Sequence, residues 1–445
     1  MIILEKPFIS ETLLSLLEAE KISVLKNDVS EEYSAKYNLY LIDDEEAREA
    51  CRRGERVYTI SENALSWIFE NHPDENLKES IRIIKDKSKF RDVCKKLYPD
   101  FYYKKINIKD LRDVDADSLP YPIVLKPAIG FLSIGVYTIE NKEDWEKSLA
   151  EIYTNFDAKS SAFPVSVIEK TSFIIEEYIK GDEFAVDAYY DTMGEPVVLN
   201  IYKHPFVSEK DVSDRLYISS KSIYDKYLES FLTFLREINT VLKFKNFPFH
   251  IEFRISDRIN PIEMNAMRFA GLCVNELSCH MYGYHSVKSY LDDLHPDYST
   301  LWKGHEDKIY GFIILERMSP EQKLPPATAD SPLGSTAAGS SASTTQGTAM
   351  TDSPLGTVTA GSPLGFTTAD SPQGTDAAGS FARSEELDYE KLQNRLSSDG
   401  LKVLEIRKVK NDDLAVHSFV FFETPKTNQA VQSKILQYQI KDFLK

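Results

Sequence analysis

An acidic and an amide side chain at alternate positions of an apolar run stand out in this sequence of 445 residues. Glu263 and Asn265 lie in "NPIEMNAMRFAG", and Glu252 lies in the preceding run "FHIEFRI". Alternate residues of a strand share one face, so a hairpin of the two runs would bring these three side chains together. Their oxygen atoms suit Mg²⁺, which also takes water and substrate phosphates as ligands. A structural ion-pair cluster is the alternative.

Two arginines border this predicted hairpin. Arg254 shares a strand face with Glu252, and Arg268 follows Asn265 by a few residues. A guanidinium group offers several donors in a planar fork that matches phosphate oxygens. The two arginines are therefore candidates to hold a phosphate or a transferred phosphoryl group.

The segment "VLKPAIGFLSIGVY" combines a lysine with a loop that contains glycine. Lys126 ends an apolar strand, and Gly130, Ser133 and Gly135 follow before a second apolar run. Glycine lets a backbone approach a polyphosphate closely with its N–H groups turned inward, and lysine adds a compact positive charge. This pattern predicts a phosphate-binding loop. A hairpin loop with a solvated lysine is the alternative.

The segment "FIIEEYIKGDEFAVD" crowds carboxylates around a glycine turn. A purine base needs a backbone donor and acceptor, with a further acceptor for its exocyclic amine, and ribose hydroxyls suit a carboxylate. Glu176, the backbone of Tyr178 and Ile179, and Glu183 could provide these groups. A solvated acidic turn is the alternative.

The surrounding pattern predicts a multidomain chain of the α+β and α/β classes. Residues 1–85 alternate short apolar runs with helical patterns, which is typical of a small α/β domain. Residues 86–300 mix strands and helices, with a nucleotide lid lobe over about residues 120–190. Residues 301–323 and 384–445 predict a compact C-terminal α+β module of three strands and two helices.

Residues 324–383 interrupt that module. They are dominated by Ser, Thr, Ala, Gly and Pro, and units such as "DSPLG" and "GSPLG" recur. Such a composition buries too little apolar surface to offset chain entropy, so the segment is predicted to be a disordered insertion. It is either an interaction tether or an expanded repeat without a partner.

The composition limits the partners. A net charge of −17, from 53 basic and 70 acidic residues, argues against general nucleic-acid or anionic-membrane binding. No CxxC pair occurs among the four cysteines, which favours a reducing compartment. The N-terminal residues lack a leader pattern, and no run approaches the roughly 18 apolar residues of a membrane span. We therefore expect a cytoplasmic protein.

Four motifs in this order resemble those of the ATP-grasp superfamily of carboxylate–amine ligases. "DKSKFR" resembles its Asp-Lys segment, and "VLKPAIGFLSIGV" resembles its Lys-Pro strand and phosphate loop. "IIEEYIKGDEF" is similar to the hinge that holds adenine, and "IEFR…PIEMNAMR" to the metal-binding strands. The resemblance spans roughly residues 1–300 and implies a small N-terminal domain followed by a two-lobed ATP-grasp domain.

The resemblance also implies a role for each matching residue. Lys87 and Lys126 would contact phosphates, Glu176 the adenine amine, Ile179 the base through its backbone, and Glu183 the ribose. The implied nucleotide-binding residues are Lys87, Lys126, Gly130, Ser133, Gly135, Glu176, Tyr178, Ile179 and Glu183. The implied ligands of one or two Mg²⁺ ions, or of Mn²⁺, are Glu252, Glu263 and Asn265, and the implied catalytic residues are Arg254 and Arg268.

The last motif departs from the family pattern at two places. The family has arginine four residues after the glutamate, where this chain has Met267 and places Arg268 one residue later. Ala266 also replaces the usual proline. These departures bear on whether Arg268 reaches the phosphate.

The activity implied by the resemblance is an ATP-dependent, ADP-forming ligation. A small-molecule carboxylate would become an acyl phosphate, which an amine, such as that of an amino acid or peptide, then attacks. An ATP-grasp kinase, a carboxylate–thiol ligase and a non-catalytic ATP-binding regulatory protein are alternatives. Tyr202, Lys203, His204 and Arg215 either contribute to the substrate pocket or form a structural strand pair. The C-terminal module is either a cover over the site or a homodimer contact.

Overall fold

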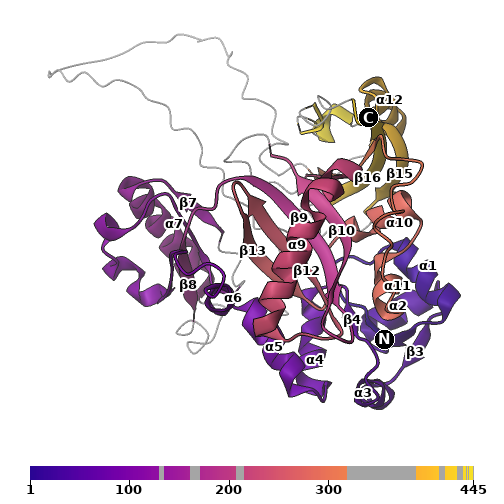
Figure 1. The fold of residues 1–445 in the computed structure, drawn as a ribbon, viewed down its shortest axis with the longest axis horizontal. Helices are drawn as coiled ribbons and strands as arrows, with labels where there is room; N and C mark the ends of the chain where they lie inside the picture. Colours follow the sequence, from indigo (N-terminus) through magenta and orange to yellow (C-terminus); the bar gives the residue numbers. More distant parts are fainter. Residues whose placement is uncertain are drawn as a thin grey trace, which may run out of the picture.

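The computed structural model (Figure 1) describes most of the chain outside the repeat segment. The described residues are 1–129, 135–160, 171–206, 215–317, 387–409, 416–427, 434–436, 438 and 440–443. The predicted insertion over residues 324–383 lies outside them. No helix among these residues is long and apolar enough to cross a membrane.

The N-terminal residues form a parallel sheet with helices between its strands. The strands are β1 (Ile2–Ile3), β2 (Ser23–Leu25), β3 (Tyr40–Ile42) and β4 (Tyr58–Thr59), in the order β3-β2-β1-β4. The helices are α1 (Glu11–Glu20), α2 (Asp28–Ser34) and α3 (Asp44–Arg52). The side chains of Ser10, Asn27 and Asp43 cap these helices by accepting a backbone N–H of the first turn. This domain confirms the α/β pattern predicted from the sequence.

A helical connection leads from this domain towards the site. It contains η1 (Glu62–Ala64), α4 (Leu65–Asn71), α5 (Glu75–Lys85) and α6 (Lys87–Cys94). Asp86 ends α5 and caps α6, because its carboxylate accepts the backbone N–H of Ser88 at 2.9 Å. The cap fixes Lys87 as the first residue of α6.

A second sheet forms a small lobe over residues 103–177. Its strands are β5 (Tyr103–Asn107), β6 (Ile123–Pro127), β7 (Tyr137–Ile139) and β8 (Ser172–Glu177), in the order β5-β8-β6-β7, and α7 (Lys142–Ser160) lies beside them. Short 3-10 turns, η2 (Ile108–Asp113) and η3 (Ala116–Ser118), link β5 to β6. Leu125, Trp145, Phe173 and Ile175 are buried in its separate core. Figure 1 shows this small lobe and the N-terminal domain on opposite sides of the central sheet.

The largest sheet has eight strands in the order β13-β12-β9-β10-β11-β14-β16-β15, and its strand pairs are antiparallel. The strands are β9 (Asp182–Tyr190), β10 (Pro196–His204), β11 (Leu216–Ser220), β12 (Phe247–Ile255), β13 (Ile259–Ala266), β14 (Lys308–Glu316), β15 (Lys402–Lys408) and β16 (Val416–Pro425). The long helix α9 (Lys221–Leu242) covers one face, where Phe231 packs against Phe184 and Phe253. The opposite face carries the polar residues of β9 and β12, and we name it the polar face.

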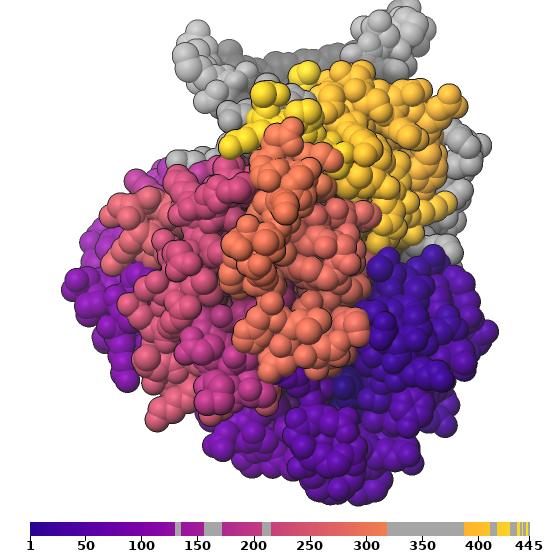
Figure 2. Space-filling model, turned by 45° about the vertical axis from the view of Figure 1, so that its right-hand side comes forward, coloured from indigo at the N-terminus to yellow at the C-terminus, as the bar shows by residue number. Residues whose placement is uncertain are grey.

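The segment after β13 continues through η4 (Val274–Glu276), α10 (Leu277–Tyr282) and α11 (Ser286–Leu291). The C-terminal part adds α12 (Tyr389–Ser398), β15, β16 and η6 (Ile440–Phe443). Its strands extend the central sheet through β14, because β14 pairs with β11 on one side and β16 on the other. Figure 2 shows these C-terminal elements (yellow) next to the N-terminal domain (indigo), with the chain around residues 270–317 (orange) beside both.

Candidate functional site

The two strands predicted to bind a metal form an antiparallel hairpin on the polar face. Glu252 of β12 lies opposite Glu263 of β13, and His250 lies opposite Asn265. The Asn265 amide donates to Glu263 Oε1 at 3.4 Å. The structure therefore brings together the three side chains that the alternation of the sequence places on one face.

The electrostatics of this hairpin favour a cation. Burial and the facing charge of Glu263 raise the pKa of Glu252 above its ordinary value. Burial also opposes ionisation of Glu263, but Lys87 and Lys126 hold its pKa below the ordinary value. Two carboxylates and one amide oxygen are a donor set that suits Mg²⁺, which completes its shell with water and phosphate. In the described part of the chain, no group of three or more His, Cys, Asp or Glu side chains could hold a metal by itself.

Lys87 reaches this hairpin from α6. Its Nζ lies 2.9 Å from Glu263 Oε2, and both side chains are largely buried, at 22% and 16% exposed. The backbone N–H of Lys87 donates to the carbonyl of Ala128 at 2.8 Å, which fixes the start of α6 against the end of β6. The structure thus places Lys87 between the small lobe and the metal-binding candidates.

Lys126 and Glu176 of the small lobe form a buried triad with Arg91 of α6. Lys126 Nζ lies 2.6 Å from Glu176 Oε1, and Arg91 Nε lies 2.8 Å from Glu176 Oε2. Burial opposes the charge of Glu176, yet the two cations lower its pKa to about 2. Burial lowers the pKa of Lys126, and Glu176 acts in the opposite direction. Both carboxylate oxygens of Glu176 therefore have cationic partners, and its contact with adenine stays a prediction.

Arg254 fastens the turn that joins the small lobe to the central sheet. It donates to Glu183 Oε2 at 3.1 Å, to the Tyr178 hydroxyl at 2.9 Å and to the Ile179 carbonyl at 3.1 Å. Glu183 also lies 3.2 Å from His204 Nδ1. Of the residues predicted to bind the base and ribose, Tyr178, Ile179 and Glu183 therefore share Arg254 as a partner, whereas Glu176 pairs with Arg91 and Lys126.

Arg268 follows the hairpin and lies on the side that faces the N-terminal domain. Met267 before it has φ +61°, and its backbone bonds to Pro248 and Thr59. Arg268 is buried, donates to the Phe269 carbonyl at 3.1 Å and lies 3.7 Å from Glu62 Oε1. The backbone turn at Met267 thus directs the displaced arginine towards the N-terminal domain.

Asp187, which is fully buried on β9, was not among the residues predicted from the sequence. Its carboxylate accepts from the backbone N–H of Ala270 at 2.7 Å, from the Tyr202 hydroxyl at 3.0 Å and from the Asn200 amide at 3.1 Å. His250 Nδ1 lies 2.8 Å from the same carboxylate. Asp187 therefore ties the strand of Glu252 and the segment after Arg268 to the centre of the sheet. Its signal in the sequence was a charge inside the apolar run "EFAVDAYY".

A second missed carboxylate, Glu276, joins three parts of the chain. It accepts from the Ser10 hydroxyl and from the Arg407 guanidinium, and Arg407 also donates to Thr12 Oγ1 at 2.8 Å. Burial raises the pKa of Glu276, but His285 and Arg407 lower it below the ordinary value overall. These partners are far apart in sequence, so no local pattern could have indicated them.

The remaining predicted residues belong to the candidate substrate pocket on β10 or to the predicted phosphate loop. Tyr202 and His204 lie on the polar face, whereas Lys203 between them forms an ion pair with Asp182 at 2.8 Å. Gly135 precedes β7, while Gly130 and Ser133 lie outside the described residues. Of the predicted phosphate loop, the structure therefore describes only the two ends, up to residue 129 and from residue 135.

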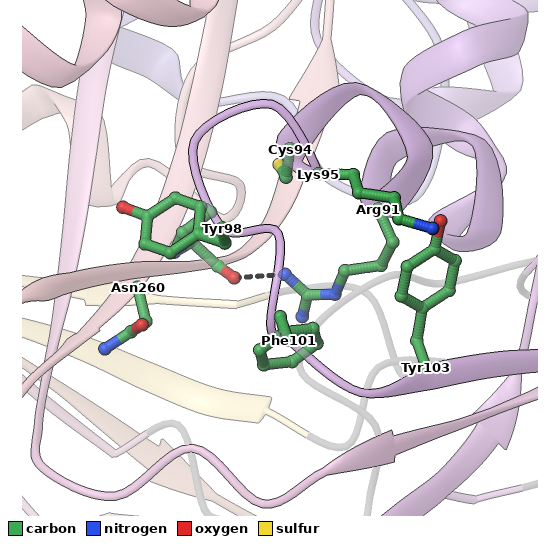
Figure 3. A pocket seen from close by; sticks show the side chains of 8 residues that line it. Arg91, Cys94, Lys95, Tyr98, Phe101, Tyr103 and Asn260 are labelled. Atoms are coloured by element: carbon green, nitrogen blue, oxygen red, sulfur yellow. Dashed lines mark hydrogen bonds between the residues drawn. The ribbon is translucent and has the colours of Figure 1, made fainter.

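A small pocket lies beside this site, at the junction of α6, β5 and β13 (Figure 3). Arg91 belongs both to the triad and to the pocket wall, because the guanidinium that binds Glu176 also donates to the Pro261 carbonyl at 2.5 Å. The pocket is lined by Arg91, Cys94, Lys95, Tyr98, Phe101, Tyr103, Asn260 and Pro261. Three of these residues, Tyr98, Phe101 and Tyr103, are aromatic.

The family described as "ATP-grasp domain" matches residues 119–276. No curated protein matches the sequence. Among solved structures, an L-amino acid ligase from Bacillus licheniformis has a TM-score of 0.59 at 15% identity, with 100% of this chain and 97% of that chain covered.

Two further solved structures are similar over nearly their whole length. An N5-carboxyaminoimidazole synthase from Aspergillus clavatus has a TM-score of 0.55 at 12% identity, with 98% of each chain covered. A phosphoribosylglycinamide synthetase from Anaerococcus prevotii has a TM-score of 0.52 at 13% identity, with 100% of this chain and 98% of that chain covered. At these identities the likeness concerns the fold, and it includes the C-terminal strands.

Proposed function

We propose that this chain, whose residues 119–276 match the ATP-grasp domain family, is an ATP-dependent ligase of the ATP-grasp superfamily. The proposed reaction joins a small-molecule carboxylate to the amine of an amino acid or peptide-like molecule, and it forms ADP and phosphate. The observation that carries the proposal is the buried hairpin in which Glu252 faces Glu263 beside the ammonium of Lys87.

The proposed nucleotide site lies between the small lobe and the central sheet. Lys87 and Lys126 would bind phosphate oxygens, and the backbone of Tyr178 and Ile179 would bind the base. Glu183 would accept the ribose hydroxyls. The contacts of Arg254 with this turn support the assignment, because they hold the turn against β12 with three hydrogen bonds.

Mg²⁺ held by Glu252, Glu263 and Asn265 would supply positive charge that screens the phosphates of ATP. Two observations support this fit. The three side chains offer oxygen atoms, and Glu252 and Glu263 are buried opposite each other, where their negative charges repel and a cation would relieve the repulsion. Arg268 and Arg254 would orient the substrate carboxylate and stabilise the acyl phosphate formed from it. The segment after β13, anchored on Asp187, would keep the site closed to water.

The experiment supplies ATP and Mg²⁺ with pools of carboxylates and amino acids, and measures phosphate release. A ligase releases phosphate only when a carboxylate and an amine are both present. Glu263→Gln should lower turnover by about 100-fold or more, because loss of metal charge stabilisation costs several kcal/mol. Glu229→Gln, on the exposed side of α9, is the control with the same charge change.

Other outcomes would reject the proposal in different ways. Phosphorylation of a single acceptor would indicate a kinase, and turnover that requires a thiol would indicate a thiol ligase. ATP binding without turnover in any pool would indicate a regulatory protein. Full activity of Glu263→Gln would reject the metal assignment.

A further inference from the structure

Glu263 has a cationic partner within the chain, although it is proposed as a metal ligand. The Lys87 ammonium lies 2.9 Å from Glu263 Oε2, and the Asn265 amide lies 3.4 Å from Oε1. Both oxygens are therefore in contact with donors of the protein itself. An ammonium group and a divalent cation on the same carboxylate oxygen repel each other, so that each weakens the binding of the other.

The position of Lys87 makes an exchange feasible. Its backbone is fixed, because the N–H donates to Ala128 and Asp86 caps the helix that it begins. Its side chain is a flexible stem of four carbons beyond the fixed backbone, so that the ammonium group can change position without moving α6. The proposed phosphate site lies at the same junction, since Ala128 directly follows β6.

The other cations of the site are held differently. Lys126 pairs with Glu176, which Arg91 also binds, and Glu176 is not a proposed metal ligand. Arg268 lies near Glu62, which also pairs with Lys85 at 2.7 Å. Among the ion pairs of the described chain, that of Lys87 joins a proposed phosphate-binding cation to a proposed metal ligand. Metal binding would therefore affect this pair directly.

We propose that Lys87 exchanges between Glu263 and the nucleotide phosphates, and that this exchange couples metal binding to nucleotide binding. A divalent cation on Glu263 displaces the ammonium, which then becomes available to a phosphate. Conversely, a nucleotide that attracts Lys87 uncovers Glu263 for the metal. The inference rests on the proposed function, and linkage requires that each ligand raise the affinity of the other by the same factor.

Metal binding to the full chain provides the first test. Mn²⁺ affinity is measured by electron paramagnetic resonance, without nucleotide, for the wild type, Lys87→Met and Lys89→Met. Lys87→Met should bind Mn²⁺ about tenfold more tightly than the wild type, within the usual range of coupling between sites. Lys89→Met is the matched control, because Lys89 lies on the same helix and pairs instead with Glu79 at 3.6 Å. Unchanged or weaker Mn²⁺ binding by Lys87→Met would overturn the inference.

Nucleotide binding provides the second test, by calorimetry with a non-hydrolysable ATP analogue in EDTA. Glu263→Gln should bind the metal-free analogue more tightly than the wild type, because Lys87 is released. In the wild type, saturating analogue should raise Mn²⁺ affinity about tenfold after correction for the complex in free solution. This coupling should be smaller in Lys87→Met.

The two tests separate the inference from the proposed function. Nucleotide binding without any coupling to metal in the wild type overturns the exchange and leaves the proposed ligase intact. Absence of nucleotide binding in every variant rejects the proposed function, while the Mn²⁺ comparison still decides whether Lys87 competes for Glu263. If Lys87→Met does not fold, the coupling between Mn²⁺ and the analogue in the wild type and the analogue affinity of Glu263→Gln still test the exchange.

Discussion

Asp187 accepts a hydrogen bond from the backbone N–H of Ala270 at 2.7 Å, across 83 positions of the sequence. The same carboxylate also lies 2.8 Å from His250 Nδ1, two residues before Glu252. One fully buried side chain thus connects β9, the strand β12 that carries Glu252, and the segment after β13. The bonds position these elements relative to each other, because a buried carboxylate is stable only when its donors remain in place.

Asp187→Asn should therefore destabilise the protein. The amide cannot accept from as many donors, so buried N–H or O–H groups lose their partner at a cost of about 2–3 kcal/mol. Urea unfolding measures this change. Asp182→Asn on the same strand is the control, because Asp182 is exposed and forms a surface pair with Lys203. A loss no larger than that of the control would contradict the anchoring role.

Glu176→Gln should lower the free energy of unfolding by about 3 kcal/mol at neutral pH, because two buried cations lose their charged partner. Glu177→Gln is the neighbouring control. Glu177 is partly buried and accepts a hydrogen bond from the Tyr102 N–H at 3.5 Å, so its loss should cost less than about 1 kcal/mol. Equal losses for the two variants would show that the triad does not stabilise the small lobe.

The contribution of Glu176 should also depend on pH in one direction. Its pKa falls from the ordinary 4.5 to about 2 in the folded chain, so the unfolded chain binds the proton more tightly. The stabilisation is therefore complete above pH 4.5 and is lost as pH falls towards 2. The difference in stability between wild type and Glu176→Gln should narrow over that range in denaturant titrations. If the difference in stability between the wild type and Glu176→Gln stayed constant from pH 4.5 down to about 2, the pKa of Glu176 would not be lowered in the folded chain.

Gly181→Ala should destabilise more than Gly54→Ala, although both glycines have positive φ, at +125° and +80°. A Cβ at Gly181 would fall on the carbonyl of Ile255, whereas one at Gly54 meets no heavy atom within 4 Å. Positive φ costs alanine about 1 kcal/mol at both sites, and overpacking adds about 1–3 kcal/mol at Gly181. Urea unfolding of the two variants tests the difference. Equal losses of stability in the two variants would mean that the backbone at Ile255 moves away from the added methyl group at little cost.

Arg407→Met should weaken the attachment of the C-terminal strands. It leaves Glu276 buried without its guanidinium partner, at a cost of about 3 kcal/mol in the free energy of unfolding. Arg395→Met is the control in the same part of the chain, since its pair with Asp399 involves an arginine side chain that is 59% exposed. If both variants unfold like the wild type, Arg407 is not the connection between the three parts.

The parts of the site that lie within one strand or one turn could be predicted from the sequence. Alternation placed Glu252 and Glu263 on one face, because period two is a property of any strand. The α/β pattern of the N-terminal residues likewise follows from local apolar periodicity and from caps such as Ser10.

The parts that depend on contacts between distant segments could not be predicted. Nothing near Glu62 in the sequence indicates that it lies 3.7 Å from Arg268, and nothing near Arg407 indicates Glu276. The partner of Lys87 belongs to this group as well, since α6 and β13 meet only in the folded chain. Local patterns specify elements, whereas ion pairs across domains depend on how the elements pack.

The strand β14 has a hydrogen-bonded neighbour on each side, β11 and β16. Its residues Ile309–Leu315 are buried, and Phe312 packs against Phe419 and Phe421 of β16. A chain that ended before α12 would leave this apolar strand as the edge of the sheet. Such an edge offers free backbone groups beside exposed phenylalanine, and it recruits strands of other molecules. By pairing with β14, strand β16 therefore covers an edge that would otherwise be open to pairing with another molecule.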